Sequence, residues 1–183
     1  MANSNGYVVL RQAVSASVAS KLADDFQNGL IHNVPTATKD KYNEYKVPQT
    51  GFEIKDEFLR HSLTDQNMDK DLVAPLFYPN QTPSSPQTLN LGMFHETDAD
   101  PTKLMTAGPR IYVTIAITRL SPSNGWFTFY EGSHQHRSRL GRKVALDLEA
   151  GDAVAWRGDL VYFHSPGGGG IFLVLSFPMG SDD

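Results

Sequence analysis

The chain has 183 residues, of which 40% are hydrophobic and 10% aromatic, and its formal net charge is −4. This length allows one domain with a sizeable core, and the single basic run at residues 137–143 does not support nucleic acid as the main partner. The absence of cysteine excludes a disulfide framework, an iron–sulfur cluster and a thiolate zinc site, so any metal needs His, Asp or Glu ligands.

We expect a soluble, cytoplasmic protein. No apolar run approaches the roughly 20 residues that a membrane span needs, and residues 1–10 lack the charged and apolar regions of a signal peptide. The expected partner is a small-molecule substrate, with no role for nucleic acid or a membrane. The sequence leaves open whether the chain forms a homo-oligomer.

The first predicted elements are a strand and a helix. Residues 6–10 form a short apolar run that is typical of a strand. Val18, Leu22 and Phe26 then recur every four residues, which predicts a helix that Ser15 or Ser17 caps. The dipeptide at 28–29, Asn-Gly, is expected to end this helix.

Residues 31–90 are polar and are interrupted by prolines, with at best one helix at 65–74. We interpret them as an irregular insert, either a lid over a pocket or a simple cover for the sheet. We expect a single domain over residues 1–183, in which this insert precedes a β core at residues 88–178.

The β core is predicted from strands separated by turn signals. Residues 110–117 are nearly all apolar or β-branched, as expected of a central strand. The run SPSNG at 121–125 indicates a turn, with residues 126–130 as the hairpin partner. Together with a strand at 88–95 and several after residue 150, this pattern predicts an all-β barrel or jelly roll with helical decoration.

Residues 146–178 read as strand, turn, strand, glycine run and strand. In an alternating strand Tyr162 and His164 point to one face, which we expect to be the floor of a ligand pocket. The glycines at 167–170 are costly to order. They indicate a mobile lip, a close approach of ligand or backbone, or simply a long hairpin loop.

Three pieces of the chain carry a resemblance to a known family. They are residues 6–9 (GYVV) with the helix after them, residues 123–125 (SNG) leading through a strand to residues 131–134 (EGSH), and the Gly-Asp dipeptide at 151–152. Their order resembles the phytanoyl-CoA dioxygenase-like branch of the iron(II)/2-oxoglutarate oxygenases, over most of the chain. The resemblance implies a double-stranded β-helix, a jelly roll of the cupin type, with Fe(II) and 2-oxoglutarate as cofactors of an active member.

An active member of this family binds iron through two His and one carboxylate. The resemblance places His95 at the first ligand position, but Thr97 where the carboxylate is expected and Tyr162 where the second His is expected. A β-bulge could restore Asp98 as the carboxylate, and His164 could reach the metal from an adjacent rung. A metal-dependent protein would then use His95, Asp98 and His164.

The 2-oxoglutarate site is also incomplete by this resemblance. Family members carry an Arg about ten residues after the second His, where it pairs with the distal carboxylate of 2-oxoglutarate. Residues 171–177 contain no Arg or Lys, so Arg110 or Arg119 would have to substitute. The resemblance therefore implies that the fold is kept while the metal and 2-oxoglutarate site is degenerate.

A pocket without iron still offers acid–base chemistry, which needs only groups with tuned pKa values on either side of a substrate. We expect His95 to act as the base and Tyr162 as the acid or oxyanion donor. His164 lies beside them, and Asp98 orients His95 if the bulge is present. The candidate substrate-binding residues are Arg110, Trp126 and Trp156.

Three functions of different classes follow from these observations. The favoured one is an isomerase or cyclase that acts on a small natural-product-like molecule without iron or 2-oxoglutarate. The second is an Fe(II)/2-oxoglutarate-dependent oxygenase with displaced ligands, and the third is a non-catalytic binding or partner subunit. In the non-catalytic interpretation, His95 is a hydrogen-bonded core histidine and Tyr162 packs its ring.

Overall fold

The computed structural model describes residues 5–29, 34–62, 76, 86–98, 100–135 and 140–179. Within these ranges the chain forms two helices and ten strands. In chain order they are β1 (Tyr7–Leu10), α1 (Ala16–Gln27), β2 (Ala37–Thr38), β3 (Tyr42–Tyr45), α2 (Gln49–Ser62), β4 (Thr88–Phe94), β5 (Arg110–Ala116), β6 (Phe127–Tyr130), β7 (Lys143–Ala145), β8 (Ala153–Arg157), β9 (Tyr162–His164) and β10 (Ile171–Pro178).

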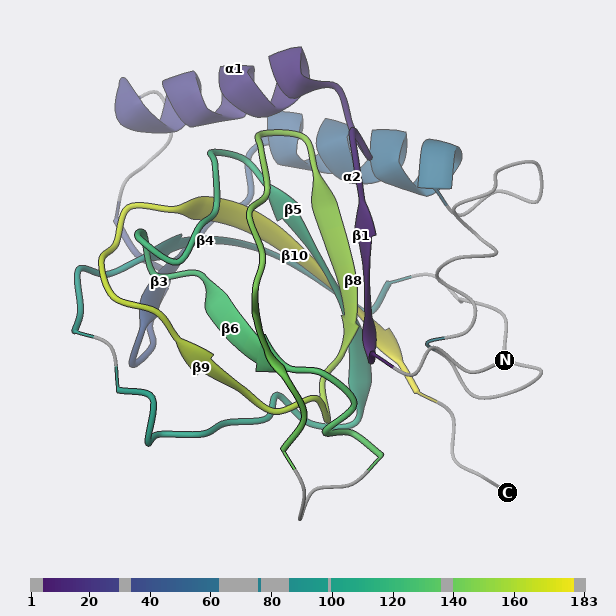
Figure 1. The fold of residues 1–183 in the computed structure, drawn as a ribbon. Coiled ribbons are helices and arrows are strands. Elements are labelled where there is room, and N and C mark those ends of the chain that lie inside the picture. The colour runs from purple at the N-terminus through teal and green to yellow at the C-terminus, as the bar shows by residue number, and fades with distance from the viewer. Residues whose placement is uncertain are drawn as a thin grey trace.

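The strands form two antiparallel sheets (Figure 1). The larger sheet has the order β1-β8-β5-β10-β4-β3-β2, and the smaller has the order β7-β6-β9. Both helices lie on one side of the larger sheet, and the smaller sheet lies on the other (Figure 1). The prediction of an all-β core with helical decoration is therefore confirmed. Neither described helix is long and apolar enough to cross a membrane.

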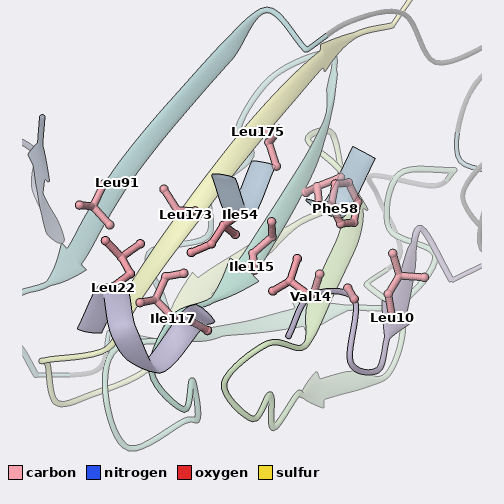
Figure 2. Close-up of a cluster of buried hydrophobic side chains, with 14 of the residues drawn as sticks. Leu10, Val14, Leu22, Ile54, Phe58, Leu91, Ile115, Ile117, Leu173 and Leu175 are labelled. Atoms are coloured by element: carbon pink, nitrogen blue, oxygen red, sulfur yellow. The ribbon is translucent and has the colours of Figure 1, made fainter. Parts of the chain in front are cut away.

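The outer face of the larger sheet packs against the two helices. Side chains alternate along a strand, so β10 turns Leu173 and Leu175 to this face. They share one buried cluster with Leu22 of α1 and with Ile54 and Phe58 of α2, as Figure 2 shows. The prediction that the first helix packs outside the sheet is confirmed.

The inner face of the larger sheet packs against the smaller sheet. The side chains on the opposite face of β10, which include Phe172 and Val174, belong to this layer. They meet a cluster of aromatic rings that includes Trp126, Phe129 and Trp156. Phe129 meets Trp126 edge-on, with ring centroids 6.0 Å apart, and lies tilted against Trp156 at 5.5 Å.

Helix α1 begins and ends where the sequence predicts. Ser15 is its N-cap residue, although the Ser15 side chain makes no capping hydrogen bond. Instead the Ser15 backbone N–H donates to a carboxylate oxygen of Glu57 on α2, at 2.7 Å. Asn28 is the C-cap residue, and Gly29 follows with a φ of 70°, a conformation that glycine adopts without strain.

The interpretation of residues 31–90 as irregular is wrong for the part that the structure describes. That part contains β2, β3, the whole of α2 and the start of β4. The sequence did not reveal α2, because only Ile54 and Phe58 of its hydrophobic side chains are fully buried, Phe52 is exposed, and a glycine lies in the first turn. The expected helix at 65–74 lies outside the described residues.

The predicted hairpin between residues 110–117 and 126–130 is also wrong. β5 pairs with β8 and β10, whereas β6 pairs with β7 and β9 in the other sheet. The intervening turn carries the chain from one sheet to the other. Gly125 makes this crossing possible because its φ of 92° is strained for other residues, and a Cβ there would meet Phe94.

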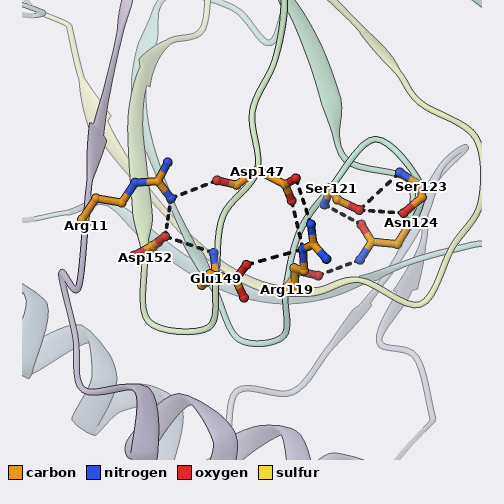
Figure 3. Close-up of polar contacts among 8 residues, drawn as sticks. All are labelled: Arg11, Arg119, Ser121, Ser123, Asn124, Asp147, Glu149 and Asp152. Carbon is orange, nitrogen blue, oxygen red and sulfur yellow. Dashed lines mark hydrogen bonds and ion pairs between the residues drawn. The ribbon is translucent and has the colours of Figure 1, made fainter.

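The Gly-Asp dipeptide at 151–152 has a structural role in this fold. The buried Asp152 carboxylate accepts hydrogen bonds from Arg11 Nη1 at 2.6 Å, from the Gln12 backbone N–H at 2.9 Å and from the Glu149 backbone N–H at 3.0 Å. Figure 3 shows the bonds to Arg11 and Glu149. These bonds fix the end of β1 against the turn before β8.

Candidate functional site

A cavity of about 510 Å³ lies on the inner face of the larger sheet. Its walls are mainly aromatic, with Tyr112, Trp126, Phe127, Trp156 and Phe172 among the lining residues. Tyr112 and Trp156 stack at a centroid distance of 4.9 Å. This volume falls within the range of about 300–1,000 Å³ that is typical of small-molecule sites.

Strand β9 places Tyr162 and His164 in this cavity. The two residues alternate with Phe163, so both face inward while Phe163 packs with Tyr130 and Val161 on the opposite side. Each of the two is only 6% exposed. Their ring centroids are 5.8 Å apart. The prediction that they share one face is confirmed.

His164 is held in one orientation by the chain. Its Nδ1 lies 3.3 Å from the Gly125 carbonyl oxygen. A carbonyl oxygen only accepts, so Nδ1 carries the proton and Nε2 keeps a lone pair. The pKa of His164 is lowered to about 4, chiefly by burial and also by Lys41 and Lys103, while the Gly125 carbonyl and Asp40 oppose the shift. The imidazole is therefore neutral at pH 7.

This shift predicts a loss of stability in acid. Between pH 6.5 and 4 the unfolded His164 binds a proton while the folded side chain does not, so the free energy of unfolding should fall by up to about 3 kcal/mol as pH drops through this window. Urea titrations at pH 7 and 4.5 measure the fall. The fall in the free energy of unfolding should be smaller in His164→Gln. It should stay the same in His61→Gln, because His61 is exposed. Equal falls in both variants would contradict the assignment.

Tyr162 presents a protonated hydroxyl to the cavity. Burial raises the pKa of Tyr162, and Tyr42 and Tyr112 raise it further, so the phenol stays neutral across the physiological range. Among the described residues none forms a hydrogen bond with this hydroxyl. The ring is fixed by Phe127 at 4.5 Å and Trp156 at 5.5 Å between centroids. The hydroxyl is therefore available to donate to a bound molecule.

The three candidate substrate-binding residues also line the cavity. Arg110 Nη1 donates to Gln87 Oε1 at 2.7 Å and to Ser176 Oγ at 3.3 Å. The Trp156 indole N–H donates to Thr114 Oγ1 at 3.1 Å. The buried indole N–H of Trp126 has no acceptor within the described part of the chain.

The structure does not bring His95 and Asp98 into the cavity lining. His95 Nε2 lies 3.0 Å from the Lys39 carbonyl oxygen, so this nitrogen carries a proton and donates to the backbone. Asp98 is exposed. Tyr162 and His164 therefore lie together with the substrate-binding candidates, while the other two candidate catalytic residues lie apart from them.

Sequence reasoning missed other lining residues, notably Lys41, Tyr42 and Tyr112. Tyr112 was open to prediction, because it alternates with Arg110 along one strand. Lys41 and Tyr42 carried no usable signal, since they belong to the segment that was interpreted as irregular.

The glycine run at 167–170 is a place of close backbone approach. The Gly167 N–H donates to the Thr97 carbonyl at 2.9 Å, and the Gly169 N–H donates to the Phe94 carbonyl at 2.9 Å. A Cβ on Gly168 would collide with the backbone of His95 and Glu96. Of the three readings of this run, the structure supports the approach of backbone to backbone.

The residues at the expected iron site do not fit iron. His95 uses Nε2 for a backbone carbonyl, Thr97 is a neutral hydroxyl, and Tyr162 stands where the second His is expected. Within the described ranges no group of three or more His, Asp or Glu side chains is placed to hold a metal ion. The carboxylate and imidazole donors that Fe(II) prefers are therefore not gathered there.

The strand on which the family carries its 2-oxoglutarate Arg offers no cation in this chain, and of the two possible substitutes only Arg110 lines the cavity. β10 turns Phe172, Val174 and Ser176 into the cavity, and none is a cation. Arg119 lies outside the lining. Its Nε and Nη2 donate to the Asp147 carboxylate at 3.0 Å and 2.9 Å, and its Nε lies 3.6 Å from a carboxylate oxygen of Glu149 (Figure 3). These contacts tie Arg119 to the surface of the fold.

The fold is the double-stranded β-helix found in 2-oxoglutarate-dependent enzymes, as solved structures show. No family model and no curated protein matches the sequence. The non-heme epimerase SnoN from nogalamycin biosynthesis is 15% identical over 95% of this chain and 78% of its own, with a TM-score of 0.63.

Two further structures give the same result. HygX from Streptomyces hygroscopicus, solved with nickel and 2-oxoglutarate, is 13% identical over 96% of this chain and 83% of its own, with a TM-score of 0.64. The non-heme carbocyclase SnoK from nogalamycin biosynthesis is 12% identical over 96% of this chain and 80% of its own, with a TM-score of 0.63. Identities this low establish the shared fold alone.

Proposed function

We propose that this chain is an isomerase or cyclase that acts on a small natural-product-like molecule by acid–base chemistry, without iron or 2-oxoglutarate. The observation that carries the proposal is the neutral His164 beside the protonated Tyr162 in a cavity lined by aromatic rings. We further propose that the chain belongs to the phytanoyl-CoA dioxygenase-like branch. An epimerase and a carbocyclase among the structural neighbours, both described as α-ketoglutarate-dependent, support rearrangement as the type of reaction on this fold, while the metal-free route is proposed from the residues of this chain alone.

The proposed reaction is a proton relocation. His164 Nε2 accepts a proton from a substrate C–H or O–H, and the Tyr162 hydroxyl donates to the oxygen on which negative charge develops. The imidazolium then returns the proton at another atom, so the product has the same composition as the substrate. A bound ligand that displaces water from between the aromatic walls would strengthen both polar contacts.

In this proposal His164 takes the role of base because it lines the cavity and keeps an unprotonated nitrogen. The sequence-based choice of His95 for that role, with Asp98 to orient it, stays a prediction. Tyr162 keeps the role of acid or oxyanion donor in both versions. Turnover in His164→Gln compared with turnover in His95→Ala distinguishes the two versions.

Iron and 2-oxoglutarate are expected to leave the protein unchanged. Anaerobic titration should show no uptake of one iron per chain, and the melting temperature should stay the same with both added, because a ligand that binds only the folded state would raise it. At 100 times its dissociation constant such a ligand would add about 2.7 kcal/mol. HygX, solved with nickel and 2-oxoglutarate, is the positive control. Stoichiometric iron uptake with turnover of 2-oxoglutarate would instead favour the oxygenase alternative.

A further inference from the structure

The turn between β2 and β3 places charged residues on one wall of the cavity. Lys39, Asp40 and Lys41 all belong to the lining. Asp40 is already paired, since its carboxylate lies 2.6 Å from Lys103 Nζ. Lys39 is exposed and lies 4.0 Å from Glu44. Lys41 is half-buried, and within the described part of the chain no carboxylate forms an ion pair with it.

Lys41 and Arg110 belong to opposite ends of the sheet that floors the cavity. The Lys41 carbonyl accepts from the His95 N–H, next to Phe94, whose own N–H donates to Gly170 just before β10 begins. Arg110 pairs with Pro178 at the far end of β10. A strand rises about 3.3 Å per residue, so Phe172 and Pro178 are roughly 20 Å apart. Arg110 is tethered at this far end by its bonds to Gln87 and Ser176, so among the described residues Lys41 is the lining lysine without an ion pair at the opposite end.

From this placement we infer that the cavity takes an aromatic or polycyclic organic acid, whose anionic group pairs with Lys41 while its rings lie against Phe127 and Trp156. The inference rests on the proposed function, because it assumes that this cavity holds the ligand. The aliphatic stem of a half-buried lysine packs along the apolar wall while its ammonium group pairs with the acid. The carboxylate end of the ligand would then lie at the His164 end of the cavity.

Electrostatic contacts across the cavity support this orientation. Lys41 and Lys103 both act to lower the pKa of His164, so their field reaches the imidazole. A cation at this place stabilises the negative charge that develops when a base removes a proton from the ligand. One residue would therefore serve both to select an acidic ligand and to assist the proposed reaction.

A matched pair of probes tests the inference, an anthracene carboxylate and the corresponding anthracene carboxamide. They share the ring system and differ in charge. We expect the wild-type protein to bind the carboxylate about tenfold more tightly, as a partly desolvated charged hydrogen bond allows. Lys41→Met should remove this preference and leave carboxamide affinity unchanged. Lys46→Met, which deletes the same charge from an exposed residue outside the lining, should retain it.

The outcomes separate this inference from the proposed function. Equal affinity for both probes in the wild-type protein, or a preference that survives Lys41→Met, would overturn the inference and leave the cavity as a binding site. Binding of the carboxylate that persists when Val174→Trp fills the cavity would also overturn it. If neither probe binds, the inferred ligand class is overturned, whereas the proposed function is decided separately by turnover in His164→Gln. Melting temperatures of all variants verify that they are folded.

Discussion

Replacing His164 with Gln is expected to lower turnover about 10²- to 10⁴-fold, the usual contribution of a positioned general base. The Gln amide can still donate to the Gly125 carbonyl, which holds the His164 ring, but it has no nitrogen that takes up a proton. The wild-type rate should fall in acid only near pH 4, where the imidazole becomes protonated. Both quantities are measured as turnover against pH with an identified substrate.

Companion variants separate catalysis from folding. Tyr162→Phe should also slow turnover, and its melting temperature should stay within a few degrees of wild type, because no described residue bonds to the hydroxyl that is lost. His95→Ala decides between the two choices of base. Full activity in His164→Gln together with a large loss in His95→Ala would return that role to His95. Free imidazole should restore part of the rate in His164→Ala if the missing group is a base.

Replacing Phe58 with Ala is expected to lower the free energy of unfolding by about 3–5 kcal/mol, as is usual when a large aromatic ring is removed from a core. The Phe58 side chain is fully buried between α2 and the outer face of the larger sheet. Alanine leaves a cavity that the surrounding leucine and isoleucine side chains fill only in part. Urea or thermal unfolding, followed by circular dichroism, measures the difference.

Phe52 on the same helix provides the control. Its side chain is 42% exposed, so Phe52→Ala removes the same ring from a place where water already reaches it. This variant should cost about 1 kcal/mol or less. Similar losses in the two variants would show that α2 does not pack against the sheet as described.

The parts of the fold that follow from local pattern could be predicted from the sequence. The four-residue spacing of Leu22 and Phe26 predicted α1, and the β-branched run at 110–117 predicted a central strand. By contrast, α2 fully buries only Ile54 and Phe58, with Leu59 partly buried beside them, so its apolar stripe is narrow. The sheet to which a strand belongs is set by long-range pairing, so the hairpin prediction failed at Gly125.

The same distinction holds for the candidate site. Tyr162 and His164 were found because alternation along one strand is a local property. His95 was chosen by its place in a sequence pattern, but its surroundings depend on the Lys39 carbonyl, which is 56 positions away in the chain. The polar neighbours of a side chain come from such distant segments, and no local pattern contains them.

The position of β10 has a consequence for how the chain acquires its structure. β10 follows every other described element in sequence, and yet it lies in the middle of the larger sheet, between β5 and β4. Until it is in place, the two halves of that sheet have no shared partner, and each presents an unpaired apolar edge. Pairings between such distant segments form slowly, and exposed edges invite association with other chains. Nascent chains that lack β10 should therefore depend most on chaperones during synthesis.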